Sequence, residues 1–140
     1  MHLHASTSVS ESADHRRSIR QFTSDPILRE EILDIVRLAG RAPTAWNIQP
    51  WHFFVAVDAD LKQQLQAAAY GQPQVGSAPA VIVLTSDMEH ALTILAETRT
   101  PGMPEEKKTA EIASVSGYFS NMSIHERAAW GRNQTNIALG

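Results

Sequence analysis

Apolar residues recur at helical spacing between residues 26 and 39, so a helix with one buried face is predicted there. The segment Ser24-Asp25-Pro26 is expected to open this helix, with Asp25 as the N-cap and Pro26 in the first turn. Gly40 is expected to end it. The apolar face consists of Leu28, Ile32, Ile35, Val36 and Ala39.

Two apolar runs, 52–57 and 78–85, predict β-strands. The second run is continuous and bounded by turn residues, so a buried central strand is expected. Between them, Asp58 or Asp60 is expected to cap a helix that ends in the polar turn 70–74. Two strands joined by a helix favour, by default, a parallel βαβ unit.

The last third of the sequence predicts helices. One carries Met88, Ala91, Leu92 and Leu95 on one side, and the next, 105–121, carries Ile112, Val115 and Phe119. Ser123-Ile124-His125-Glu126 matches a capping box, which indicates that a further helix begins there. This helix becomes apolar just before Gly140, and an open apolar stripe needs a covering partner, so we expect the sequence to be cut short.

Composition indicates one globular domain, since the chain has 140 residues, 43% hydrophobic and 19% charged. Residues 1–14 lack periodicity and are expected to form a disordered tail before a domain at 15–140. The absence of a long apolar run or signal-like segment favours a cytoplasmic protein without a membrane partner. A net charge of -3 argues against nucleic acid as a partner.

The sequence has no cysteine, so any redox chemistry requires a bound cofactor. Dinucleotide-binding, P-loop, nucleophile-elbow and zinc-protease motifs are absent. His2 and His4 are interpreted as a chance pairing, and the carboxylates serve mainly as helix caps. We therefore assign no catalytic acid, base or nucleophile and no metal ligand.

Two polar motifs lie on either side of the first long helix. The basic turn, residues 16–20, places three arginines and a serine together, as an anion site or a solvated turn. The loop 41–53 carries hydroxyl, carboxamide and indole groups, which suit a polyol or heterocycle or, alternatively, plug a core with tryptophans. A helix of about 15 residues separates them by roughly 20 Å. A site that uses both therefore requires a dimer, or other segments that bring them together.

Together these motifs resemble the nitroreductase family of flavoenzymes. Its members have an Arg-Arg-Ser-x-Arg turn, matched by Arg16-Arg17-Ser18-Ile19-Arg20, and an Ala-Pro-Ser-x-x-Asn-x-Gln-Pro-Trp loop, matched from Ala42 to Trp51 with Thr44 in place of serine. The turn 68–72, the apolar strand and the Trp130 helix also fit. The resemblance implies an α+β, three-layer fold with a mixed or antiparallel central sheet flanked by helices, incomplete at the C-terminus.

The family binds FMN at a homodimer interface and uses NADH or NADPH. By position, Arg16, Arg17 and Ser18 would contact the FMN phosphate and ribityl chain, and Arg20 the N1/O2 edge of the flavin. Pro43, Thr44 and Asn47 would come from the partner subunit, and Gln72 would contact the ring. Trp46 would narrow the substrate channel.

The implied reaction passes a hydride from NAD(P)H through flavin N5 to a nitro-aromatic, quinone or related small-molecule acceptor. Family members continue past the last helix into segments that also contribute to the site. Two alternatives remain: a truncated, non-catalytic module that binds flavin or only dimerises, and an unrelated α/β domain whose arginine turn binds another phosphate.

Overall fold

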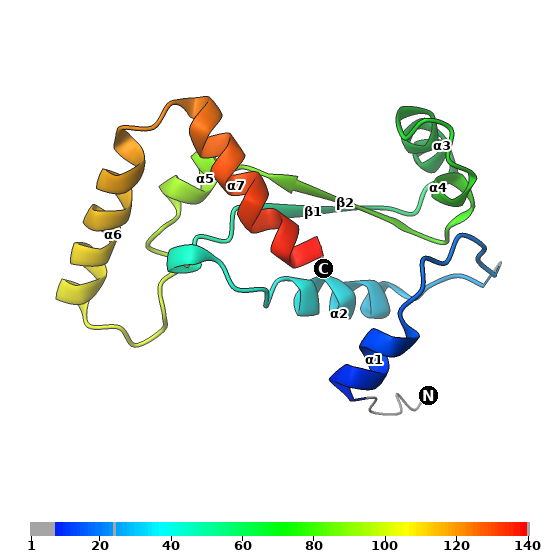
Figure 1. Cartoon of the computed structure of the whole chain (residues 1–140), viewed down its shortest axis with the longest axis horizontal. Coiled ribbons are helices and arrows are strands. Elements are labelled where there is room, and N and C mark those ends of the chain that lie inside the picture. Colours follow the sequence, from blue (N-terminus) through cyan, green and yellow to red (C-terminus); the bar gives the residue numbers. More distant parts are fainter. Residues whose placement is uncertain (1–7, 24, 140) are drawn as a thin grey trace.

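The computed structural model describes residues 8–23 and 25–139 (Figure 1). In chain order the elements are α1 (Val9–His15), α2 (Arg29–Ala39), the 3-10 helix η1 (Ala45–Asn47), β1 (Trp51–Ala56), α3 (Ala59–Ala68), α4 (Pro73–Ser77), β2 (Val81–Ser86), α5 (Met88–Thr93), α6 (Glu105–Ser120) and α7 (Ile124–Leu139). Among the helices of these residues, none has the length and apolar character to cross a membrane.

The strands β1 and β2 pair antiparallel, in a register from Trp51↔Ser86 to Ala56↔Val81. The antiparallel arrangement is confirmed, whereas the default parallel βαβ unit is wrong. Helices α3 and α4 pack against each other beyond one end of the strands, so the chain re-enters the sheet from the end at which it left (Figure 1).

The expectation that the second apolar run is a buried central strand is also wrong. Within the described ranges β1 is the only strand that pairs with β2. Helix α7 packs on these two strands, while side chains such as Ile82 stay exposed. A continuous apolar run therefore does not require burial on both faces here.

The buried core lies where α5, α6 and α7 meet the loop that precedes β1. Its fully buried members are Ile48, Met88, Ala91, Leu95, Val115 and Phe119. The apolar faces predicted on α5 and α6 are confirmed, because their predicted residues form most of this cluster. The core thus places the polar loop directly against the C-terminal helices.

Helix α2 begins three residues later than expected. Glu31 caps it by accepting a hydrogen bond from the backbone N–H of Leu28 at 2.9 Å, so Asp25 and Pro26 precede the helix. Ser24 lies outside the described residues. Gly40 ends the helix as predicted. Only Ile32 of the predicted apolar face is buried, which leaves an apolar surface along α2.

The remaining caps follow the sequence closely. Asp58 accepts a hydrogen bond from the N–H of Leu61 at 2.9 Å and starts α3. The capping box of α7 is present: the Ser123 hydroxyl and backbone N–H donate to the Glu126 carboxylate, each at 2.7 Å. These bonds hold the pKa of Glu126 below its ordinary value.

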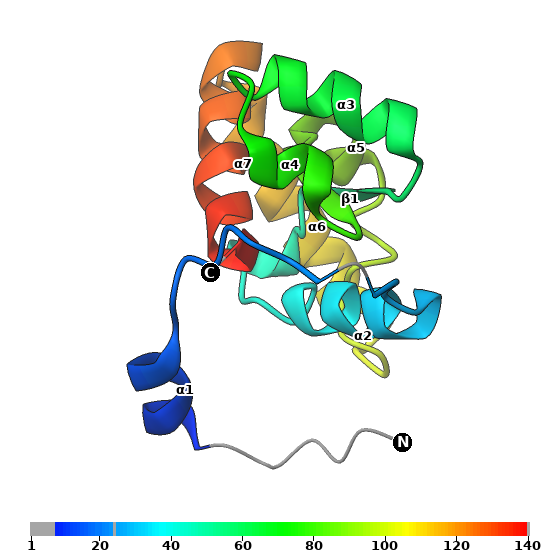
Figure 2. The same ribbon diagram turned by 90° about the vertical axis from the view of Figure 1, so that its right-hand side faces the viewer.

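Residues 9–15 form α1 instead of the expected disordered tail. A capping box not noticed in the sequence, in which Ser8 and Glu11 bond reciprocally, starts this exposed helix. Figure 2 shows α1 standing apart from the other helices. Residues 1–7, including His2 and His4, lie outside the described residues.

Candidate functional site

The basic turn forms an extended, exposed segment between α1 and α2. Arg17 donates through Nη1 to the carbonyls of Asp14 at 2.7 Å and Arg16 at 2.8 Å. Within the described residues, the side chains of Arg16 and Arg20 have no hydrogen-bond or ion-pair partner. Unpaired guanidinium donors beside the Ser18 hydroxyl are suited to a phosphate.

The two apolar residues in and beside the basic turn are exposed and do not pack into the core. Ile19 is 68% exposed and Phe22 is 44% exposed. These two apolar side chains therefore do not anchor the turn to the core.

The loop between α2 and β1 has an unusual backbone. Trp46, Asn47 and Gln49 have φ values of 53°, 51° and 51°, in the left-handed region. This conformation costs a non-glycine residue about 1–2 kcal/mol, less for asparagine, and it persists only where surrounding contacts enforce it. The backbone of the loop is therefore strained.

Several contacts hold the loop in this conformation. Ile48 is fully buried in the core. The Thr44 hydroxyl accepts a hydrogen bond from the N–H of Gln49 at 3.1 Å, and the Ala45 N–H donates to Gln134 Oε1 of α7 at 2.9 Å. Asn47 donates through Nδ2 to the Thr98 carbonyl and accepts through Oδ1 from Gln49 Nε2. The predicted polar residues Thr44 and Asn47 are thus held in fixed positions.

Neither tryptophan of the loop fills the core, so the alternative in which they plug it is wrong. Ile48, not a tryptophan, fills the core. Trp46 is 40% exposed and lies 6.3 Å from Trp130 in a stacked arrangement, with Tyr118 at 5.1 Å between ring centroids. Trp51 starts β1. Trp46 therefore rests on α6 and α7 with part of its ring accessible.

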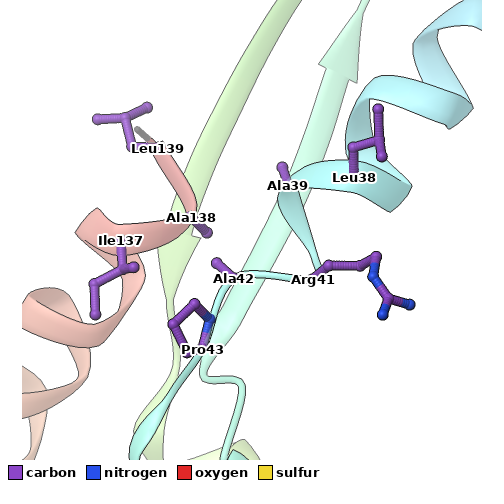
Figure 3. A pocket seen from close by; sticks show the side chains of 8 residues that line it. All are labelled: Leu38, Ala39, Arg41, Ala42, Pro43, Ile137, Ala138 and Leu139. Atoms are coloured by element: carbon purple, nitrogen blue, oxygen red, sulfur yellow. The ribbon is translucent and has the colours of Figure 1, made fainter. Parts of the chain in front are cut away.

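Pro43 lines an open groove between the end of α2 and the end of α7 (Figure 3). The groove has a volume of about 490 Å³. It is lined by Leu38, Ala39, Arg41, Ala42, Pro43, Ile137, Ala138 and Leu139. Figure 3 shows the Arg41 side chain pointing away from the apolar residues of α7. The groove is thus mainly apolar and does not by itself form a phosphate site.

A single chain does not bring the predicted site residues together. The basic turn lies before α2 and the loop beyond its other end (Figure 1). Helix α2 has 11 residues, a length of about 16 Å. Gln72 is exposed at the start of α4, where its Oε1 accepts from Gln74 Nε2 at 2.6 Å. Pro43, Thr44 and Asn47 form one local group and the basic turn forms another, and Gln72 belongs to neither.

One residue at the loop was missed by the sequence analysis. Arg99 is buried, 6% exposed, and contacts both the loop and α6. A buried arginine leaves no pattern in the sequence, because its partners lie 12 and 53 residues away. Among residues 8–23 and 25–139, no group of three or more His, Cys, Asp or Glu side chains is placed to hold a metal ion.

Comparison with known proteins identifies relatives over most of this length. The family model described as "Nitroreductase family" matches residues 13–133. An NADH dehydrogenase from Thermus thermophilus is 41% identical over 125 residues, which is 89% of this chain and 61% of the relative. An oxygen-insensitive NADPH nitroreductase from Helicobacter pylori is 33% identical over 132 residues, 91% of this chain and 63% of the relative.

The fold has solved counterparts. A protein from Exiguobacterium sibiricum, assigned as a nitroreductase and solved in complex with FMN, superposes with a TM-score of 0.85 at 28% identity. The superposition covers 96% of this chain and 67% of that one. This chain thus spans about three fifths of the length of the two curated relatives. On the family match and the fold together, the chain belongs to the nitroreductase family.

Proposed function

We propose that this chain is part of an FMN-dependent oxidoreductase whose flavin lies at a homodimer interface. The observation that carries the proposal is the placement of two exposed polar groups, the basic turn and the loop, at opposite ends of α2. A second copy can set its loop beside the first copy's basic turn. Family membership and the FMN complex of a solved structure with this fold support FMN as the cofactor.

The basic turn would bind the charged end of the cofactor. The unpaired guanidinium of Arg16, with Arg17 and Ser18, provides donors for the phosphate and ribityl oxygens. Arg20, exposed in the same segment, would lie at the N1/O2 edge of the flavin. A cation at that edge stabilises negative charge that collects there on reduction.

The loop would cover the cofactor from the partner subunit. Thr44 accepts from the Gln49 N–H through its hydroxyl oxygen, and the hydroxyl can also donate one hydrogen bond. Asn47 gives one amide hydrogen to Thr98 and keeps the other. Pro43 lies beside these two in the chain, and Gln72 would provide a further polar contact to the ring.

Exposed apolar side chains support dimerisation. Leu33 and Leu38 of α2 and Phe54 of β1 are exposed, as is Val57 just after that strand. Exposed apolar surface of this kind marks protein interfaces. A homodimer that buries it would also bring the two halves of the site together.

When bound, FMN would supply hydride transfer from NADH or NADPH to a nitro-aromatic, quinone or related acceptor. The residues of this chain would bind and orient it, and none is assigned as an acid or base. The proposal includes a cytoplasmic location, where the nicotinamide co-substrates are available.

The purified chain tests the proposal through its flavin spectrum and an FMN titration. Arg17→Gln should weaken FMN binding about tenfold or more, since a charge-assisted hydrogen bond is worth about 1.5–3 kcal/mol. Arg37→Gln, which breaks the exposed pair with Asp34 on α2, should leave binding unchanged. A colourless chain that takes up no added FMN would refute the proposal for this chain.

Arg20 is tested by the flavin midpoint potential. Arg20→Ala should lower the potential, because the reduced flavin loses its nearby positive charge. An unchanged potential would exclude the assigned role.

The alternative is a flavin-binding or dimerisation module without turnover. This alternative is considered because the chain spans about three fifths of the length of the curated relatives. If FMN binds but excess NADH and NADPH leave the bound flavin oxidised under anaerobic conditions, the module is the correct description.

A further inference from the structure

The loop that carries Thr44 and Asn47 needs an external brace. Its three residues with positive φ lie within four positions, and none is glycine. The η1 turn alone offers two short-range backbone bonds, Asn47 N–H to Thr44 O at 3.0 Å and Ile48 N–H to Ala45 O at 3.3 Å. Such a turn is held only if neighbouring groups satisfy its remaining carbonyls.

Arg99 supplies this brace. Its Nη2 donates to the carbonyl of Trp46, the first of the left-handed residues. Its Nε donates to the carbonyl of Leu95 at 3.1 Å, which fixes the guanidinium to the end of the α5 segment. The same side chain therefore joins the strained loop to a buried core residue.

Glu111 of α6 orients the guanidinium. Arg99 Nη1 forms an ion pair with Glu111 Oε1, and the arginine side chain is only 2% exposed. Each of the three guanidinium nitrogens thus has an acceptor in a different segment. A lysine has a single nitrogen and cannot reproduce this planar set of three directions.

We infer that Arg99 is a positioning residue, which holds the loop 44–49, with its left-handed residues Trp46, Asn47 and Gln49, in this conformation and so presents Thr44 and Asn47 to a ligand. Glu111 acts through Arg99. The role in setting the backbone stands on the contacts above, whereas the identity of the ligand as FMN rests on the proposed function.

Hydrogen exchange of the loop amides tests the inference without flavin. In Arg99→Gln, the amides of Asn47, Ile48 and Gln49 should exchange at least tenfold faster, while the amides of β1 and β2 keep their rates. In Arg99→Lys, the same loop amides should exchange faster than in the unchanged chain, because lysine cannot make the three bonds of the guanidinium. Glu111→Gln, which keeps an acceptor oxygen, should give a smaller increase in the exchange rates of the loop amides. This variant replaces Arg99→Gln in the test if Arg99→Gln does not fold.

A matched control exists at the other end of the helices. Arg127 donates to both carboxylate oxygens of Glu89, at 2.6 and 3.0 Å, and through Nη1 to the carbonyl of Met122 at 2.6 Å. Arg127→Gln removes a comparable arginine bridge remote from the loop and should not change loop exchange.

The second readout is FMN affinity, measured by quenching of flavin fluorescence. Arg99→Gln should weaken binding at least tenfold, and Arg127→Gln should not. Loop amides that keep their protection in Arg99→Gln would overturn the inference, as would rates that rise equally in loop and strands. If the unchanged chain binds no FMN, the proposed function fails, but the exchange rates still decide the role of Arg99.

Discussion

Gly131 of α7 lies against Ser86 of β2 and Met88 of α5, and the structure leaves no room there for a side chain. A Cβ built on Gly131 would lie 2.4 Å from Met88 Cγ and 2.6 Å from Ser86 Oγ. Met88 is buried in the core and the Ser86 hydroxyl is buried under α7, so neither can move away freely. Gly131→Ala must therefore shift α7 or its neighbours.

The expected cost combines two opposing effects. Overpacking of a well-packed site costs about 1–3 kcal/mol. Replacing a helical glycine with alanine returns up to about 1 kcal/mol of helix propensity. We expect Gly131→Ala to lower the free energy of unfolding by about 1–2 kcal/mol.

Gly117 of α6 is the matched control, because a Cβ there would meet nothing within 4 Å. Gly117→Ala has the propensity gain without the clash and should raise the free energy of unfolding by about 0.5–1 kcal/mol. Urea unfolding followed by far-ultraviolet circular dichroism measures both variants under the same conditions.

The shift should also reach the loop. Helix α7 carries Gln134, which accepts the Ala45 N–H, and Trp130, on which Trp46 stacks. Gly131→Ala should therefore increase hydrogen exchange of the Ala45 amide relative to the strand amides. A Gly131→Ala chain as stable as Gly117→Ala, with unchanged exchange at Ala45, would refute the packing argument.

Two further predictions concern the core and the last helix. Ile48→Ala should lower the free energy of unfolding by about 2–5 kcal/mol because Ile48 is fully buried, while the exposed Ile124→Ala should change it by no more than about 0.5 kcal/mol in the same urea titration. The folded-state pKa of Glu126 is depressed, so its stabilisation is complete above the ordinary value of 4.5 and is lost as pH falls through the lower folded pKa. Glu126→Gln should accordingly flatten the loss of stability below about pH 4.5 seen in thermal unfolding from pH 7 to 3, and an identical pH profile for the two chains would contradict this role.

Much of the helical structure could be predicted because its determinants are local. Asp58, Gly40 and the Ser123–Glu126 pair act within three or four residues of the ends that they define. The faces of α5 and α6 follow from the helical repeat. The same reasoning missed the Ser8–Glu11 box. It placed the start of α2 at Pro26 because Asp25 and Pro26 form a local start signal, whereas the N-cap in the structure is Leu28.

The candidate site likewise has features that the sequence predicts and features that only the fold determines. The residue types of the basic turn and the loop are visible in the sequence, and their resemblance to a flavoenzyme family agrees with the family match. The left-handed backbone of the loop is not visible in the sequence. Positive φ at Trp46 and Gln49 is unusual for these residues, and it is stabilised by Arg99, Gln134 and the buried Ile48.

The sequence by itself determined where α3, α6 and α7 begin and where α2 ends, which faces of α5 and α6 are apolar, and which polar residues are available for a ligand. The tertiary structure decided that β1 and β2 run antiparallel, that Ile48 instead of a tryptophan fills the core, and that Arg99 braces the loop. The physical reason is the distance along the sequence between the residues that interact. Caps and helical faces depend on neighbours within a turn, whereas strand direction, burial and the Arg99–Trp46 contact join segments that only folding brings together.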